Sequence, residues 1–199
     1  MKYFYDLEFL ENGSTIQLIS IGIAALDGRE YYAVNEAVGM DLQGQDELYK
    51  SVTADEWLMQ NVVPHLPLRR DNSEKPLIRH RSSQSNSWFS LDHKDLRVLP
   101  LRVIAKQVKA FLYADPGDIE LWAWYGAYDH VALMQLWGRM VHKPDRLPMW
   151  THDLNQYAEQ NGFTPDEISE AVPQTSTAHN ALDDARHCRD MWHYLESKP

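Results

Sequence analysis

The N-terminal third of the chain has the residue pattern of β-strands. Residues 2–8 alternate between the two faces of a strand, and three large apolar side chains share one face: Tyr3, Tyr5 and Leu7. Residues 16–26 are rich in β-branched side chains, which is typical of a buried strand. Asp27-Gly28 then predicts a tight hairpin into a third strand over 30–34. We therefore predict an antiparallel meander of three strands at the start of the chain.

The rest of the chain combines helical spacing with short apolar runs. Thr53-Ala-Asp-Glu56 has the form of a capping box and predicts a helix that continues to about Val63. Residues 64–95 are rich in Pro, Ser, Asn and Arg and are expected to form a long irregular connection. Further helices are predicted after Pro100, over 128–137, before Gly162, from Thr164 and over 178–195, and further strands over 119–124 and 149–151. This order predicts one α/β domain over 1–199, in which a mixed β-sheet is flanked by α-helices.

The length and composition agree with that fold class and exclude several others. A chain of 199 residues suits one domain, and its hydrophobic fraction of 44% is too high for a disordered protein. No apolar run approaches the roughly 20 residues of a membrane helix, and carboxylates at Asp6 and Glu8 do not fit a signal peptide. The one cysteine, Cys188, can form neither an internal disulfide nor a cysteine-based zinc site. We expect a cytoplasmic protein with no membrane segment.

The net charge of the chain bears on its partners. Its 19 basic and 29 acidic residues give a net charge of −10, whereas a protein that binds duplex DNA non-specifically is normally basic. An acidic chain can still act on a nucleic acid if metal ions bring positive charge to the phosphate. Most of the acidic residues serve solubility. The carboxylates that carry information about function are therefore those on otherwise apolar faces, where they do not serve solubility.

Asp6 and Glu8 form the first pair of such carboxylates. At the strand period of two they project from the same face, roughly 6–7 Å apart, and their neighbours are Tyr, Phe and Leu rather than Lys or Arg. One interpretation is an exposed face at the edge of the sheet. The other is a site for a divalent cation, since hard oxygen ligands suit magnesium or manganese.

The last predicted helix carries a carboxylate on its apolar side. At 100° per residue, Asp184 falls within an apolar stripe, whereas Asp183 points to the opposite side. A buried carboxylate needs a metal ion or a strong partner. Five helical steps would turn His179 and Asp184 apart, so they can share a site only if His179 lies in the loop before the helix. A structural or surface role is the alternative for His179.

The third candidate motif ends at Asp129. Residues 122–129 predict a strand followed by a helix with Asp129 in its first turn, where a carboxylate also interacts favourably with the helix dipole. In chain order the motifs are Asp6-Leu-Glu8, Tyr125-Gly-Ala-Tyr-Asp129 and His179-Asn-Ala-Leu-Asp-Asp184. Together they resemble the DEDD superfamily of 3′-to-5′ exonucleases, in its histidine branch. Three longer segments are similar to the actinobacterial polyadenylate-specific exoribonucleases, the RNase AS family: 3–9, 28–33 and 122–133.

The resemblance implies a fold, a set of partners and a mechanism. It implies an RNase H-like domain, a homodimer, and release of AMP from the 3′ end of single-stranded RNA with a preference for poly(A). It also implies two Mg²⁺ ions, for which Mn²⁺ can substitute, held by four carboxylates: Asp6, Glu8, Asp129 and Asp184. His179 would be the general base that takes the proton from the attacking water, because the ordinary pKa of histidine is near 6.5. These five residues are therefore the expected catalytic set.

Aromatic and basic residues near the motifs are candidate substrate contacts. Phe9, Tyr128 and Trp150 are expected at the terminal nucleotide, because aromatic rings stack on unpaired bases. Many DEDD enzymes have Thr where this chain has Phe9, and core packing is the alternative for that ring. Arg79 and Arg81 are candidate phosphate contacts, with a solvated loop as the alternative. Seven tryptophans and ten tyrosines also favour a dimer, because aromatic side chains are enriched at interfaces.

Three other functions are compatible with the same residues. A DNA 3′-5′ exonuclease would need the same catalytic set, because metal chemistry at the phosphate senses little of the sugar. A non-catalytic RNA-binding module could retain the fold without turnover. A structural protein whose tryptophans form an interface would have no dependence on metal.

Overall fold

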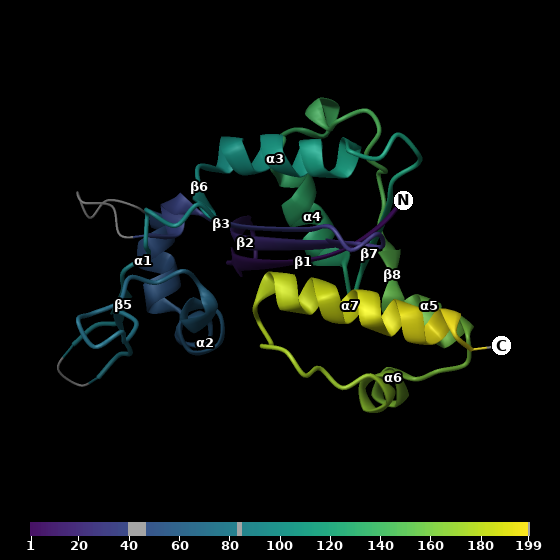
Figure 1. Ribbon diagram of the computed structural model, residues 1–199. Helices are drawn as coiled ribbons and strands as arrows, with labels where there is room; N and C mark the ends of the chain where they lie inside the picture. The colour runs from purple at the N-terminus through teal and green to yellow at the C-terminus, as the bar shows by residue number, and fades with distance from the viewer. Residues whose placement is uncertain (40–46, 83–84, 199) are drawn as a thin grey trace.

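The computed structural model describes residues 1–39, 47–82 and 85–198. At its centre is a six-stranded mixed sheet in the order β6-β3-β2-β1-β7-β8 (Figure 1). Its strands are β1 (Lys2–Glu11), β2 (Ile16–Ala25), β3 (Glu30–Asn35), β6 (Val98–Leu99), β7 (Glu120–Ala123) and β8 (His152–Asp153). The first three strands form the predicted antiparallel meander, and β7 and β8 continue the sheet parallel to β1. This order is that of the expected RNase H-like fold.

Helices cover both faces of the sheet (Figure 1). One face carries α3 (Leu101–Tyr113) and α4 (Ala127–Gln135), and the other carries α5 (Leu154–Gln160), α6 (Pro165–Ala171) and α7 (Ala181–Glu196). The alternation along β1 explains the two cores, since Tyr3 and Tyr5 pack with α3 and α4 whereas Phe4 packs with α5, α6 and α7. The predicted mixed sheet flanked by helices is confirmed. None of the helices in the described ranges is long and apolar enough to cross a bilayer.

A smaller group of elements packs at one end of the sheet, which we call the accessory lobe (Figure 1). It consists of α1 (Glu47–Ala54), α2 (Glu56–Asn61), the helical turn η2 (Val63–His65) and the paired strands β4 (Ile78–Arg79) and β5 (Trp88–Phe89). Buried Met59 and Phe89 of the lobe belong to one apolar cluster with Ile19 and Val34 of the sheet. The accessory lobe therefore shares a core with the sheet. Two further helical turns, η1 (Glu36–Val38) and η3 (Met140–His142), lie outside it.

The structure corrects the prediction of a capping box at Thr53. Thr53 lies inside α1, and the N-cap of α2 is Asp55, whose side chain accepts a hydrogen bond of 2.9 Å from the N–H of Leu58. Asp is as good an N-cap as Thr, so the sequence pattern fits either residue, and the packing of α1 decides between them.

Two other segments also differ from their predictions. Residues 64–95 are not an irregular connection throughout, because Ile78 pairs with Phe89 in the β4–β5 ladder. The strand predicted over 149–151 begins instead at His152, which pairs with Trp122 of β7. In both cases the strands have two residues each, too few for an alternating pattern to be recognised in the sequence.

Gly22 of β2 allows α7 to approach the sheet closely. Gly22 lies opposite Asp6 in the β1–β2 register. A Cβ atom at Gly22 would lie 2.2 Å from the backbone carbonyl carbon of Ala181, so any larger residue would displace the first turn of α7. This close packing holds the start of α7 against the strands that carry the acidic motif.

Candidate active site

The first two carboxylates project from β1 toward α7, as the strand period predicts. Asp6 and Glu8 both line a cavity of about 370 Å³, and Glu8 is buried. A shift in the pairing with β2 occurs between Glu8 and Phe9. Phe9 also borders the cavity while it packs against the core on the α3–α4 face. The irregularity of the strand therefore brings an aromatic ring beside the acidic pair.

Asp129 reaches the same cavity from the first turn of α4. Its buried side chain accepts a hydrogen bond of 2.9 Å from the backbone N–H of Leu7, between the two carboxylates of β1. The turn before α4 is held in place by Asp153, whose Oδ2 accepts the N–H of Gly126 at 3.0 Å. Asp129 is therefore fixed to the strand that carries the other acidic side chains.

His179 and Asp184 approach from the start of α7. Helix α7 begins at Ala181, later than the predicted residue 178, because Asn180 caps it by accepting two N–H groups. His179 thus lies in the preceding loop, as its pairing with Asp184 required. Its backbone adopts a left-handed conformation with φ of +61°, and its N–H donates a 2.9 Å hydrogen bond to Oδ2 of Asp184.

The structure brings all five residues to the cavity. Ligand atoms of Glu8, His179 and Asp184 lie within 4.8 Å of one another, the arrangement expected of a site that can hold a metal ion. Nδ1 of His179 lies 4.0 Å from Oε1 of Glu8. By contrast, Asp183 forms an ion pair with Arg186 at 2.7 Å and is not among the residues that line the cavity in the described part of the chain.

The carboxylates of the cavity have strongly perturbed acidities. Burial raises the pKa of Asp6 well above its usual range, and the neighbouring carboxylates, Asp129 first, raise it further. Burial and the charges of Asp184 and Asp129 raise the pKa of Glu8 to about 8. Burial raises the pKa of Asp129 to about 6, although the N–H of Leu7 opposes that shift. No Lys or Arg is among the described residues that line the cavity. The donor set therefore fits a cation, which would offset the mutual repulsion.

The three predicted substrate contacts occupy different positions. Phe9 lines the cavity and stacks with Tyr128, at 6.3 Å between ring centroids and 14° between ring planes. The ring of Tyr128 is 58% exposed beside it. Trp150 is 63% exposed in the loop before β8 and is not among the cavity-lining residues that the structure describes. The geometry therefore joins Phe9 and Tyr128 into one aromatic surface and leaves Trp150 apart.

Two residues that the sequence did not indicate also contact the site. Nε2 of Gln174 donates a 2.5 Å hydrogen bond to Oδ1 of Asp184, from the loop after α6. Trp57, on α2 of the accessory lobe, lies edge-on to the ring of His179 with centroids 5.0 Å apart. Neither residue lies in one of the three motifs, so nothing in the sequence marks them.

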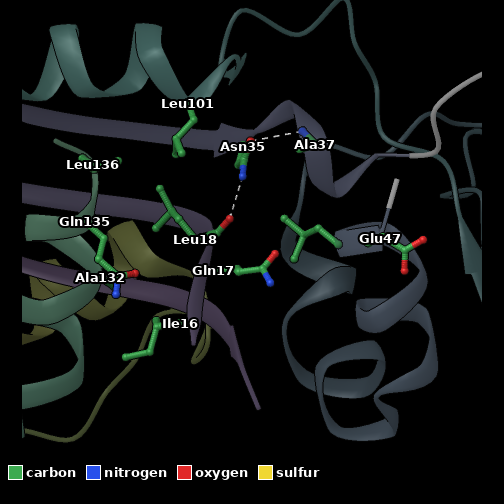
Figure 2. A pocket seen from close by; sticks show the side chains of 11 residues that line it. Ile16, Gln17, Leu18, Asn35, Ala37, Glu47, Leu101, Ala132, Gln135 and Leu136 are labelled. Carbon is green, nitrogen blue, oxygen red and sulfur yellow. Dashed lines mark hydrogen bonds between the residues drawn. The ribbon is translucent and has the colours of Figure 1, made fainter. Parts of the chain in front are cut away.

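A second cavity, of about 350 Å³, lies between α4, the start of β2 and the end of β3 (Figure 2). Its lining is mainly aliphatic. The side chain of Asn35 is engaged there by the carbonyl of Leu18 and the N–H of Ala37. Glu47 is the carboxylate among its lining residues, and it pairs with Lys50 at 3.0 Å. This cavity therefore does not have the clustered acidic donors of the first one.

Two solved structures illustrate what this chain is similar to in fold. One is the Mg²⁺- and Mn²⁺-bound form of S. pombe Pop2p, with 12% identity, a TM-score of 0.48, and coverage of 99% of this chain and 83% of that chain. The other contains the yeast NOT1 MIF4G domain co-crystallised with CAF1, with 9% identity, a TM-score of 0.45, and coverage of 99% and 81%.

Comparison of amino-acid sequences found relatives with higher identity. The 3'-5' exoribonuclease Rv2179c of Mycobacterium tuberculosis (strain ATCC 25618 / H37Rv) is 38% identical over 187 residues, which cover 94% of this chain and 88% of the relative. The 3'-5' exoribonuclease MT2234.1 of the strain CDC 1551 / Oshkosh has the same identity and coverage. A family described as the 3'-5' exoribonuclease Rv2179c-like domain matches residues 1–196. In agreement with the resemblance noted in its motifs, the chain belongs to this family of 3'-5' exoribonuclease domains.

Proposed function

We propose that this protein is a 3′-to-5′ exoribonuclease that hydrolyses single-stranded RNA from its 3′ end. The observation that carries the proposal is the convergence of four carboxylates and His179 on one cavity, in a chain that belongs to an exoribonuclease family. The open cavity beside an exposed aromatic surface suits a chain end with unpaired bases.

The four carboxylates are the residues that would hold two Mg²⁺ ions, with Mn²⁺ as a substitute. They supply hard oxygen donors, and the lack of a basic neighbour among the described lining residues leaves their charge uncompensated. When bound, such ions provide positive charge for the attacking and the leaving oxygens of the phosphodiester. Asp129 is aligned by the N–H of Leu7, and Asp184 by Gln174 and the N–H of His179, so the protein orients these donors itself.

His179 is the proposed general base. Its side chain is 43% exposed at the cavity, which leaves a ring nitrogen accessible to a water molecule. Its backbone is tied to Asp184, and its ring packs against Trp57, so both the main chain and the ring have a defined position. This ring would take a proton from water, and the resulting hydroxide would attack the terminal phosphorus as the bond from phosphorus to the 3′-oxygen breaks. The 3′-oxygen of the shortened strand takes a proton from solvent, and the released product is a nucleoside 5′-monophosphate, which is AMP from poly(A).

A preference for adenine is the most specific part of the proposal. Phe9 and Tyr128 offer a stacking surface, but stacking tolerates every base. Support for adenine comes from the similarity of residues 3–9 and 122–133 to polyadenylate-specific enzymes, because these segments carry both rings. Trp150 remains a proposed contact that would require a bound RNA to reach it.

The test is a comparison of three labelled single strands of equal length: poly(A), poly(U) and DNA. The proposal expects Mg²⁺-dependent shortening of RNA one nucleotide at a time, with poly(A) consumed several-fold faster than poly(U). Faster digestion of DNA would favour the DNA exonuclease. RNA binding without product in Mg²⁺ would favour a non-catalytic RNA-binding module. Equal rates on both homopolymers would leave the nuclease and remove the adenine preference.

A further inference from the structure

The basic residues of this acidic chain are concentrated in one segment. Residues 64–97 contain seven Lys and Arg against four Asp and Glu, a net charge of +3 in a chain whose net charge is −10. This segment forms the β4–β5 part of the accessory lobe and the connection back to the sheet. The positive charge is therefore placed on this segment rather than around the catalytic cavity.

Several of these cations form no ion pair within the described part of the chain. Arg69, Arg79 and Arg81 are exposed and form no ion pair with any described residue. The contrast is Arg97 in the same segment, whose guanidinium is held by Asp95 at 2.5 Å. The free guanidinium groups can accept an external anion without breaking an existing contact, and their planar donors match phosphate oxygens.

The hairpin combines one of these cations with an aromatic ring. Arg79 and Trp88 are cross-strand partners, and the guanidinium carbon lies 5.5 Å from the centroid of the indole ring. The other cross-strand pair, Ile78 with Phe89, packs against the core of the lobe. Because side chains alternate along a strand, the Arg79–Trp88 pair faces outward. An arginine beside a tryptophan is suited to bind one phosphate and stack one base.

The accessory lobe also borders the catalytic cavity. Trp57 of the lobe packs edge-on against His179 and is 52% exposed. His65 lies within electrostatic range of His179 and Asp184, and it also lines a polar groove of about 350 Å³ on the lobe with Arg70. His65 therefore connects the surroundings of the cavity to a polar groove on the lobe.

We infer that the accessory lobe is the binding surface for the upstream part of the RNA, with its phosphates at Arg69, Arg79 and Arg81. This inference rests on the proposed function and adds a second RNA contact outside the catalytic cavity. An acidic protein repels a polyanion at long range, and a basic hairpin on the lobe that borders the site offsets that repulsion along the path of the strand. A substrate long enough to reach the hairpin gains affinity that a dinucleotide does not have.

The test compares substrates of two lengths on a charge-neutralised hairpin. Arg79→Gln/Arg81→Gln removes two exposed charges outside the catalytic cavity. The matched control, Arg102→Gln/Lys106→Gln, removes two exposed charges from α3 that form no ion pair with the residues the structure describes. Helix α3 lies on the other face of the sheet from α7 (Figure 1). For a 20-nucleotide single strand we expect the hairpin variant to raise KM at least about 5-fold with kcat unchanged, because two phosphate contacts of the strand are lost while the catalytic cavity is untouched. For a dinucleotide, kcat/KM should stay within 2-fold of wild type.

Direct binding separates this inference from the proposed activity. Anisotropy of a labelled 20-nucleotide RNA, measured with Asp184→Asn protein so that turnover is halted, should give weaker binding for the hairpin variant than for the control. A plot of the logarithm of the association constant against the logarithm of the salt concentration should also be less steep for the hairpin variant than for the control. The expected difference in slope is about 1.4, which corresponds to two lost phosphate contacts on a single strand. Equal affinities and slopes for the two variants would overturn the inference, even if the enzyme degrades RNA as proposed. Loss of activity on the dinucleotide as well would overturn it in favour of a structural effect on the site.

Discussion

The backbone N–H of His179 donates a 2.9 Å hydrogen bond to the Oδ2 atom of Asp184. The two residues lie five positions apart, on either side of the helix start, and the hydrogen bond requires the left-handed backbone of His179. Strained backbone of this kind persists where the surrounding structure holds it in place, and it is common at functional sites. The catalytic histidine that we propose is therefore positioned by the same carboxylate that is proposed to bind metal.

Removal of single carboxylates tests the metal site. Asp6→Ala and Asp184→Asn should each abolish turnover in Mg²⁺ while the far-UV circular dichroism stays unchanged. In EDTA the melting temperature of Asp6→Ala should equal or exceed that of wild type, because a buried, mutually repelling charge has been removed. Near-normal activity of either variant in Mg²⁺ would contradict the two-metal assignment.

Replacement of His179 distinguishes a base from a metal ligand. His179→Ala should lower kcat by roughly 10²–10⁴-fold, the usual contribution of a general base. Metal affinity, followed by calorimetric titration with Mn²⁺, should change little. If the variant loses its metal ions, His179 is a ligand, consistent with its position 4.0 Å from Glu8.

The stability of the metal-free protein should depend on pH through Glu8. Its folded-state pKa of about 8 lies above the ordinary value of 4.5, so the folded state retains a proton that the unfolded state has lost. The stabilisation from that proton is present below pH 4.5 and is lost as the pH rises through 8. We expect the melting temperature in EDTA to fall between pH 6.5 and 8.5, a range above the lowered pKa values of His65 and His130.

Glu8→Gln provides the control for that pH dependence. The amide has no proton to lose, so the melting temperature of the variant should fall less over the same range and should exceed that of wild type at pH 8.5. Parallel curves for the two proteins would contradict the assigned cause. Addition of Mg²⁺ should flatten the wild-type curve, because bound cations compensate the carboxylate charge.

The contact between Gly22 and α7 gives a prediction for a residue outside the catalytic set. Gly22→Ala inserts a methyl group into the space of the Ala181 backbone. We expect a loss of about 1–3 kcal/mol in stability, together with lower kcat, because α7 carries Asp184. Gly13→Ala is the control for a loss of stability that does not displace α7. Alanine is strained at Gly13, whose φ is +78°, but nothing lies within 4 Å of the added Cβ. Equal kcat values for the two variants would exclude this positioning role.

The proposed homodimer is tested by multi-angle light scattering. Four exposed apolar side chains near the end of α4 and before β8 are available for an interface: Met140, Val141, Met149 and Trp150. At micromolar concentration we expect twice the mass of the 23.1 kDa chain. Met140→Glu/Val141→Glu should shift the protein toward the monomer, because burial of two unpaired charges is costly. A wild-type monomer would remove the proposal.

The local pattern of the sequence was sufficient to predict the features that depend only on residues close together along the chain. The alternation of Tyr3, Tyr5 and Leu7 follows from strand geometry, and the position of Asp184 on the apolar side of α7 follows from the helical period. The requirement that His179 precede the helix also came from that period alone. The order of the three acidic motifs, together with the segments 3–9, 28–33 and 122–133, was enough to associate the chain with its family.

Only the tertiary structure decided the features that join distant segments. The contact of Trp57 with His179, the hydrogen bond from Gln174 to Asp184 and the approach of Ala181 to Gly22 each connect elements separated by loops. The N-cap at Asp55 and the two-residue strands were also decided by the tertiary structure, because packing stabilises one of several local conformations of similar energy. The sequence therefore indicated the residues that we propose as the catalytic set. The fold determined which side chains surround and orient them, because non-local contacts leave no regular spacing in the sequence.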